Sequence, residues 1–388
     1  MRAYIDKSGE TIQWLEDKGL VFDCIALYYG QWPLVWHRPR GLCAEMIKLF
    51  IEECRKMGVR ILTSSPAKKL LMVENRIKGV LAEVDGGEVE IDAPAVIIAS
   101  GGYGGNKELL KKYCWYYNDN LHLGGLPHTG DGLIMAMEVG AATEDLGFLL
   151  RGGLPGPGFG VPRVLDEPYM VRVDPKGKRF IDETICGLQH AYTANESIQT
   201  TYIIFDHSMM KRISQEGTIY LVGKDRMNRY IPIPDLEKEL RTLAEKGSMV
   251  ISDSWDDIAK YIGCDTDVLK NTINEYNHCR DKGHDPVFAK DPRYLVPLRT
   301  PPYYVIGGSI KPYLDTIGGI KINEYMEVLD RNDDPIPGLY AAGVCAGGWQ
   351  AVDYNGLHMS GSAVGFAVNS GRIAAENVAL YISRKTLC

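Results

Sequence analysis

The feature that most constrains the fold is a short apolar run at residues 95–99, AVIIA, which leads directly into the glycine-rich stretch 100–106. A continuous apolar run of this length is typical of a strand buried on both faces of a parallel sheet. A helix is predicted from Lys107 onward, so the three segments form a strand–loop–helix unit. This unit predicts an α/β fold that contains a parallel sheet.

Further helices and strands are predicted on either side of this unit. Apolar residues at helical spacing predict helices over residues 8–18, with Ser8 as N-cap, over 41–57 and over 362–383. Apolar stretches separated by turn signals predict strands at 59–62, 69–74, 77–84, 88–91 and 338–342. The first four strands follow one another closely, so we expect a small antiparallel meander.

The composition changes around residue 145 and changes back after Pro301. The intervening region is richer in proline, tyrosine and charge, and a glycine- and proline-rich loop opens it. The simplest interpretation is one domain interrupted by another. We predict a first part over residues 1–144, an inserted α+β domain over 145–300 and a last part over 301–388.

Bulk composition excludes several classes of function. A net charge of −7 without a basic cluster disfavours nucleic acid and anionic membranes as partners. The first ten residues are polar, and the longest apolar run is far shorter than the roughly 20 residues that span a bilayer. The nine cysteines are scattered without CxxC spacing, which indicates reduced thiols and no metal site. We therefore expect a soluble cytoplasmic protein.

Three glycine-rich connections are candidates for ligand binding: residues 100–106, residues 128–132, and the pair formed by 338–343 and 360–363. Glycine lets backbone N–H groups approach a ligand closely, and a helix N-terminus favours negative charge. Any one of these loops also fits plain turn chemistry, but three of them favour a nucleotide site. The candidate cofactor-binding residues are Ser100, Gly101, Gly102, Asn106, Thr129, Gly130, Asp131, Gly343, Ser360, Gly361, Ser362 and Ala363.

None of these loops carries the phosphate-binding fingerprint GxGxxG. Gly102 and Gly104 begin the pattern, but Lys107 stands where its third glycine belongs. No acidic residue ends a second strand about 20 residues further on, as a ribose contact requires. The sequence thus predicts nucleotide-binding loops without the fingerprint. The missing fingerprint argues against a nicotinamide dehydrogenase.

Six motifs in a fixed order carry a family resemblance. They are residues 2–16, the turn 96–106, the helix start 129–132, GKRF at 177–180 with Glu183, GLYAAG at 338–343 and GRIA at 371–374. Together they resemble the FAD-binding flavoproteins of the fumarate reductase, succinate dehydrogenase and 3-ketosteroid dehydrogenase family. The resemblance implies FAD as cofactor and an incomplete Rossmann-like FAD-binding domain, interrupted by an α+β cap (substrate) domain. The family's first strand, its GxGxxG turn and the following glutamate have no counterpart here.

Departures from the family pattern bear on the substrate. In the dicarboxylate reductases of the family a histidine lies in an HPT motif and an arginine lies in the cap; the matching places here are Arg151-Gly152-Gly153 and Gly187. Those enzymes also have a histidine before TxGG and an arginine before the last helix. This chain has Asp315 and His358 at these two places. A dianion in a dry site needs several cationic partners. Their loss disfavours succinate and fumarate and favours a small apolar, carbonyl-bearing substrate.

The remaining pattern resembles the 3-ketosteroid dehydrogenase branch, which implies catalytic roles for Tyr304 and Gly308. A phenol and a backbone N–H group would stabilise enolate charge, and a phenol of lowered pKa would move the proton. The alternative is that residues 301–304 form a packed turn that enters a strand. His358 is a candidate donor or proton carrier, or else a structural residue. The helix start at 360–363 is expected to face the reduced flavin.

These inferences converge on an FAD-dependent oxidoreductase that acts on a CH–CH bond next to a carbonyl group. Hydride would pass between flavin N5 and carbon, as in an enone reductase or a ketosteroid dehydrogenase, with reduction preferred and the electron donor open. The alternative is a truncated, non-catalytic fragment with weak or no FAD binding and a hydrophobic sheet edge.

Overall fold

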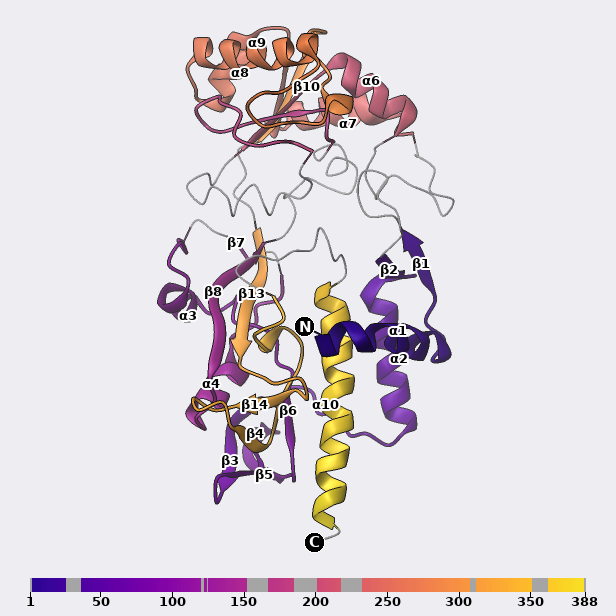
Figure 1. Ribbon diagram of the computed structural model, residues 1–388, viewed down its shortest axis with the longest axis vertical. Coiled ribbons are helices and arrows are strands. Elements are labelled where there is room, and N and C mark those ends of the chain that lie inside the picture. Colours follow the sequence, from indigo (N-terminus) through magenta and orange to yellow (C-terminus); the bar gives the residue numbers. More distant parts are fainter. Residues whose placement is uncertain are drawn as a thin grey trace.

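The computed structural model describes residues 2–25, 36–119, 122–123, 125–151, 167–184, 201–217, 232–307, 312–350 and 362–386. The helices and strands in these ranges form two groups, which lie at opposite ends of the molecule in Figure 1. We call the group drawn from residues 2–151 and 312–386 the base. The group drawn from residues 167–307 is the cap.

The base contains five helices, eleven strands and one short 3-10 helix among the residues described. These are α1 (Arg2–Asp17), β1 (Phe22–Ile25), β2 (Trp36–Pro39), α2 (Leu42–Lys56), β3 (Ala67–Val73), β4 (Arg76–Val84), β5 (Gly87–Asp92), β6 (Val96–Ile98), α3 (Lys107–Tyr113), β7 (His122–Leu123), α4 (Asp131–Glu138), β8 (Thr143–Arg151), β13 (Pro312–Ile320), β14 (Glu327–Leu329), β15 (Pro335–Ala341), η3 (Gly343–Cys345) and α10 (Ser362–Thr386). They build four small sheets, ordered β1-β2, β7-β13-β8, β14-β15-β6 and β3-β4-β5.

The predicted parallel pairing is confirmed in the sheet that contains β6. Strand β6 runs parallel to β15, with Val96 opposite Leu339 and Ile98 opposite Ala341. Leu339 is fully buried, and Ile98 is 5% exposed. Within the described part of the chain β15 is the one strand paired with β6, and Ile97 remains 37% exposed. The two strands end at one edge of the sheet, so the connections that follow them begin side by side.

The meander is confirmed for three of its four predicted strands. Strands β3, β4 and β5 pair antiparallel, as the turn signals between them indicate. The strand predicted at 59–62 is wrong, because these residues pair with no strand of the described chain. Val59, Ile61 and Leu62 are 49–57% exposed. An apolar pattern alone makes no strand where no neighbouring backbone offers hydrogen bonds.

The first helix begins earlier than predicted. Ser8 lies inside α1, where its hydroxyl donates to the backbone oxygen of Tyr4 at 2.7 Å, so it is not the N-cap. The reason is tertiary: the Asn369 amide on α10 donates to Tyr4 O and to Ser8 Oγ, both at 3.0 Å. Figure 1 shows α1 crossing α10, and the Lys7–Glu376 ion pair at 2.9 Å adds to this contact. Packing on α10 stabilises a helical turn that the sequence pattern leaves out.

The cap is one antiparallel sheet covered by helices. Its elements are β9 (Val171–Val173), β10 (Tyr202–Asp206), α6 (His207–Glu216), α7 (Leu236–Glu245), β11 (Met249–Ser252), α8 (Trp255–Ile262), α9 (Thr266–Lys282), η2 (Pro292–Tyr294) and β12 (Tyr303–Gly307). The strand order is β11-β12-β10-β9, and a single apolar core extends from Tyr169 to Ile306.

Two strands near the predicted domain boundaries pair with strands of the neighbouring group. Strand β8 continues to Arg151 and pairs with β13 of the base, although the sequence predicted the insertion from residue 145. Strand β12 pairs with β10 and β11 of the cap, although the last part was predicted to begin at residue 301. Proline and tyrosine content marks the change of composition along the chain, but it does not reveal which sheet a strand joins.

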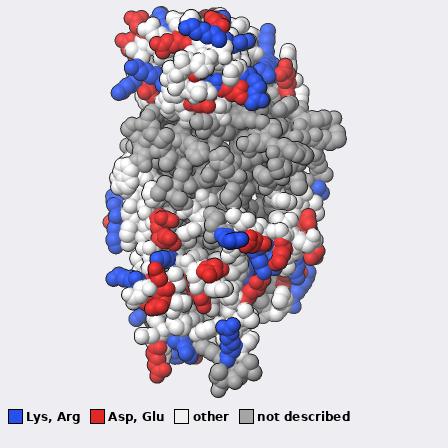
Figure 2. All heavy atoms as spheres, viewed as in Figure 1, with Lys and Arg blue, Asp and Glu red and all other residues white. Residues whose placement is uncertain are grey.

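The surface carries no large patch of one charge on the face in view. Figure 2 shows lysine and arginine interspersed with aspartate and glutamate over the described residues of that face. No helix among the described residues combines the length and the apolar character needed to cross a bilayer.

Candidate functional site

The connections after β6 and β15 meet at the carboxyl edge of the sheet. The Ala342 amide donates to Ile98 O at 2.9 Å, which continues the pairing past the end of β15. The thiol of Cys345 lies 3.2 Å from Ile98 O and 3.1 Å from Ala342 O, so it bridges the two strand ends. Carboxyl edges of parallel strands are where α/β sheets bind ligands. This edge is the candidate site.

The glycine loop after β6 is held by β13. The amides of Gly102 and Gly104 each donate to the carboxylate of Asp315 at 3.1 Å. The amide of Tyr103 donates to the Thr316 hydroxyl at 3.1 Å. A Cβ on Gly102 would stand 2.3 Å from Asp315 Oδ1, so glycine is required for this approach. The predicted ligand-binding amide of Gly102 is therefore committed to Asp315, while Ser100 and Gly101 remain partly or fully exposed.

Asp315 also binds His128. The distance from Asp315 Oδ2 to His128 Nδ1 is 2.6 Å. The aspartate side chain is 7% exposed and the histidine side chain 31%. A Cβ on Gly101 would stand 2.6 Å from the imidazole, so the ring lies flush against the loop. Both positions stand out in the sequence, His128 at the start of the glycine-rich stretch 128–132 and Asp315 as a departure from the family pattern, but neither was predicted to be a site residue.

The predicted residues around α3 and α4 come together. The side chain of Asn106 caps α3 by accepting from Leu109 N at 3.1 Å, and it donates to Thr129 O at 2.9 Å. Gly130 adopts a left-handed conformation with φ of 79° and precedes Asp131, which is exposed at the start of α4. Asn106 thus joins the first and second predicted loops, and the free carboxylate among these residues is that of Asp131.

The last helix packs against the connection after β15. The amide of Gly343 donates to Ser370 Oγ at 2.9 Å, so it too is committed within the protein. Ser362, the first residue of α10, is buried and accepts from Gln350 Nε2 at 3.3 Å; its neighbour Ala363 is partly buried. Trp349 stacks on Phe366 with 4.9 Å between ring centroids.

The indole nitrogen of Trp349 is buried and has no acceptor among the residues that the structure describes. Buried donors are nearly always satisfied, so this one calls for an acceptor from elsewhere. Residues 347–350, Gly-Gly-Trp-Gln, follow a predicted strand closely, and this aromatic next to glycines was the signal that sequence reasoning missed.

Tyr304, which was predicted to be catalytic, lies in the cap. This residue is fully buried in the cap core, where its ring stacks on Phe205 with 5.0 Å between centroids. Its hydroxyl lies 3.2 Å from His207 Nδ1. Burial raises the pKa of Tyr304 to about 12, the opposite of the lowered pKa expected of a proton carrier. Strand β12 begins at Tyr303, which agrees with the alternative interpretation of a packed turn that enters a strand.

Several other predicted residues lie outside the described part of the chain: Gly308, His358, Ser360 and Gly361, together with the departures at Gly152, Gly153 and Gly187. Among the described residues, no cluster of three or more histidine, cysteine or acidic side chains is arranged to hold a metal ion.

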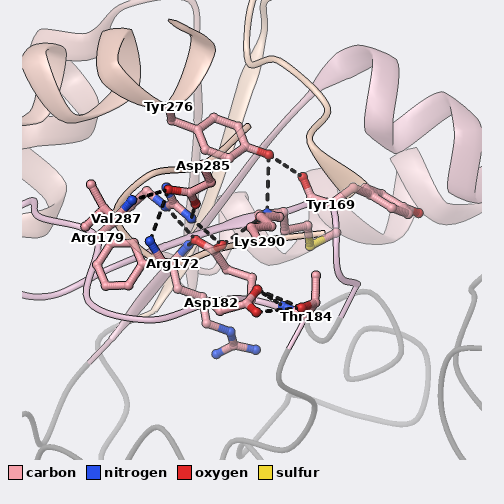
Figure 3. A network of polar contacts seen from close by, with 12 residues as sticks. Tyr169, Arg172, Arg179, Asp182, Thr184, Tyr276, Asp285, Val287 and Lys290 are labelled. Atoms are coloured by element: carbon pink, nitrogen blue, oxygen red, sulfur yellow. Dashed lines mark hydrogen bonds and ion pairs between the residues drawn. The ribbon is translucent and has the colours of Figure 1, made fainter. Parts of the chain in front are cut away.

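A second polar cluster lies inside the cap and explains the GKRF motif (Figure 3). Arg179 makes a bidentate contact with Glu183, at 3.0 and 2.8 Å, and a further one with Asp285 at 2.9 Å. Lys290 Nζ lies 3.1 Å from Glu183 and donates to Met170 O at 2.9 Å. The four charged side chains are at most 7% exposed.

The charges of these four buried side chains cancel, because two are cations and two are carboxylates. Burial on its own would raise the pKa of Glu183, but the charges of Lys290 and Arg179 outweigh burial and hold that pKa below its ordinary value. Glu183 also accepts from Arg172 N on β9 at 3.1 Å. The motif therefore ties β9 to the end of α9, and its role is to hold the cap together.

A sequence profile for the FAD binding domain matches residues 1–362. The chain belongs to this family of flavoprotein oxidoreductases. It is 28% identical to a vinyl phenol reductase of Lactiplantibacillus plantarum, an alignment that covers 100% of this chain and 81% of the relative. It is 29% identical to an NADH:acrylate oxidoreductase of Vibrio harveyi, over 96% of this chain and 36% of that much longer protein.

Two solved structures share the fold, and one of them also agrees with the family assignment. The open conformation of a flavocytochrome c3 fumarate reductase is 26% identical and matches with a TM-score of 0.66 over 98% of this chain and 63% of its own. A 3-ketosteroid-Δ4-(5α)-dehydrogenase from Rhodococcus jostii RHA1 matches with a TM-score of 0.74 and 21% identity, over 97% of this chain and 79% of its own. At 21% identity the second match supports the fold alone. Both agree with the resemblance seen in the motifs.

Proposed function

We propose that this chain forms the flavin- and substrate-binding part of an FAD-dependent oxidoreductase that reduces a C=C bond next to a carbonyl group. The observation that carries the proposal is the convergence of the connections after β6 and β15 with the start of α10 at one sheet edge. Membership of the FAD binding domain family supports the cofactor. The vinyl phenol and acrylate relatives support reduction of a conjugated C=C bond, and the acrylate relative supports a carboxyl carbon next to that bond.

The residues at this edge fit a flavin. The buried indole N–H of Trp349 lacks an acceptor, and flavin ring nitrogens and carbonyl oxygens are acceptors. Helix α10 has 25 residues, and the partial positive charge of its N-terminus at Ser362 favours the negative charge of a reduced flavin. The exposed side chains of Ser100 and Asp131 offer further polar groups. Bound FAD would supply the hydride acceptor and donor at N5.

The same edge is a poor place for a dicarboxylate. Among the described residues the carboxylate of Asp315 accepts hydrogen bonds from two amides and lies 2.6 Å from His128 Nδ1, and no lysine or arginine forms an ion pair with it. A dianionic substrate placed here would meet like charge instead of the cationic partners that it needs. This favours a neutral enone over fumarate.

Anaerobic oxidation of the reduced, FAD-loaded chain tests the proposal. We expect cyclohexenone to oxidise the flavin and to yield cyclohexanone in equal amount, while fumarate oxidises it much more slowly. Oxidation by fumarate with none by cyclohexenone would contradict the substrate class. Failure of every alkene to oxidise the flavin would contradict the function.

A further inference from the structure

We propose that His128, held by Asp315, is the catalytic residue that gives the proton to the carbon next to the carbonyl group, and removes it in the reverse direction. The proposal rests on the function above and deepens it by naming a proton carrier. The carrier expected from sequence, Tyr304, is buried in the cap core. Hydride addition to an enone leaves a carbanion-like carbon that must be protonated, so the site needs such a group.

The geometry around Asp315 orients the imidazole. The carboxylate accepts from Gly102 N, Gly104 N and His128 Nδ1, so one oxygen has one donor and the other has two. An ionised carboxylate only accepts, which places a proton on Nδ1. The ring also packs against the backbone of Gly101, where a Cβ would stand 2.6 Å from the ring. A ring fixed in this way presents Nε2 on its far side.

Nε2 of His128 is free to act. The structure gives this nitrogen no hydrogen-bond partner among the described residues, and the side chain is 31% exposed. A buried aspartate behind an imidazole fixes its tautomer and stabilises the imidazolium. His128 can therefore carry a proton on Nε2, release it and keep the one on Nδ1.

The other titratable groups packed around this pair are poorly suited to the step. Tyr103 is 1% exposed, and its hydroxyl accepts from Gly147 N at 2.9 Å. Tyr313 is 4% exposed, and its hydroxyl donates to Gly104 O at 2.9 Å. Burial raises the pKa of Tyr313 to about 12 and that of the Cys345 thiol to about 11. The nearby carboxylate of Asp131 is exposed at the start of α4.

The proposed step balances. Hydride from the reduced cofactor forms a C–H bond at the β-carbon and breaks the C=C π bond. The proton on His128 Nε2 forms the second C–H bond, at the α-carbon, and the N–H bond breaks. The product is the saturated carbonyl compound with oxidised cofactor, and neutral His128 regains its proton from water.

Exchange of the α-proton isolates this step from hydride transfer. With oxidised, FAD-loaded chain and cyclohexanone in D₂O, we expect deuterium at the α-carbon. His128→Asn keeps a donor toward Asp315 and removes Nε2, so exchange should fall by about 10²- to 10⁴-fold while FAD binding is unchanged. Asp315→Asn should also slow exchange and should shift its pH profile. His284→Asn changes an exposed histidine in the cap and is the matched control, with wild-type exchange expected.

Two further readouts keep the test decisive. Added imidazole should restore exchange in His128→Ala, which a folding defect would not allow. Imidazole ¹⁵N NMR of the chain without FAD should show the proton of neutral His128 on Nδ1, and Asp315→Asn should change that pattern.

Wild-type exchange in His128→Asn, with cyclohexenone still oxidising the reduced flavin, would overturn the role of His128 and leave the proposed function standing. Failure of cyclohexenone to oxidise the wild-type flavin would overturn both.

Discussion

Replacing Glu183 by alanine removes one of the two carboxylates in the buried cap cluster. Arg179 keeps Asp285 at 2.9 Å, but Lys290 keeps only Met170 O at 2.9 Å and the Tyr276 hydroxyl at 3.3 Å. The lysine side chain is completely buried, and Glu183 is the one carboxylate within ion-pair distance of it among the described residues, so the change leaves a buried charge without that partner. Removing one partner of a buried pair destabilises by about 3–5 kcal/mol, and we expect a loss of that size in the free energy of unfolding.

Urea unfolding followed by far-ultraviolet circular dichroism measures this loss. Glu237→Ala is the matched control: its pair with Arg241 is exposed, and such pairs contribute about 0–1 kcal/mol. The double change Glu183→Met with Lys290→Met removes both charges and should be less destabilising than Glu183→Ala alone. A loss below about 1 kcal/mol for Glu183→Ala would refute the reasoning.

The same cluster predicts a pH dependence of stability. The folded-state pKa of Glu183 is lower than its unfolded value, because Lys290 and Arg179 outweigh the effect of burial. The unfolded chain then binds more protons in acid. The stabilisation is fully present above the ordinary glutamate pKa of about 4.3 and is lost as the pH falls below it. The free energy of unfolding of Glu183→Ala should depend less on pH in this acidic range.

Three other changes test the base. Gly132→Ala puts a Cβ 2.2 Å from Ser100 Oγ, and thermal unfolding should show a loss of about 1–3 kcal/mol from overpacking. Asn106→Ala removes the cap of α3 and the contact to Thr129 O, and chemical unfolding should show a loss of about 1–2 kcal/mol, while no loss would discount the contact. Trp349→Phe keeps the stack on Phe366 and removes the unpaired indole N–H. A flavin titration should then show an FAD affinity reduced by about 2- to 10-fold, with the free energy of unfolding unchanged. An unaltered affinity would place the flavin elsewhere.

Much of the base could be predicted because its signals are local. An apolar run before glycines indicated β6, and its parallel partner β15 carries the same pattern. Asn106 is a good N-cap in sequence and caps α3 in the structure. The strand predicted at 59–62 failed because pairing depends on a neighbour far along the chain. The start of α1 was missed for a similar reason, since contacts with α10 decide it.

The site was harder to predict than the fold. Glycines at 102 and 104 looked ready for a ligand, yet their amides bind Asp315, more than two hundred residues away. Tyr304 had the right chemistry for catalysis, but the sheet register places it in the cap core. Residue type tells which groups have suitable chemistry. Whether a group faces a ligand or the interior depends on long-range packing, which no local pattern contains.

Hydrogen exchange of the chain with and without FAD tests the location of the proposed site most directly. We expect FAD to protect amides at Ser100 and Gly101 and in the first turn of α10 from Ser362, and to leave the cap strands unchanged. Protection confined to the cap, or none at saturating FAD, would contradict a flavin site at the edge where β6, β15 and α10 converge.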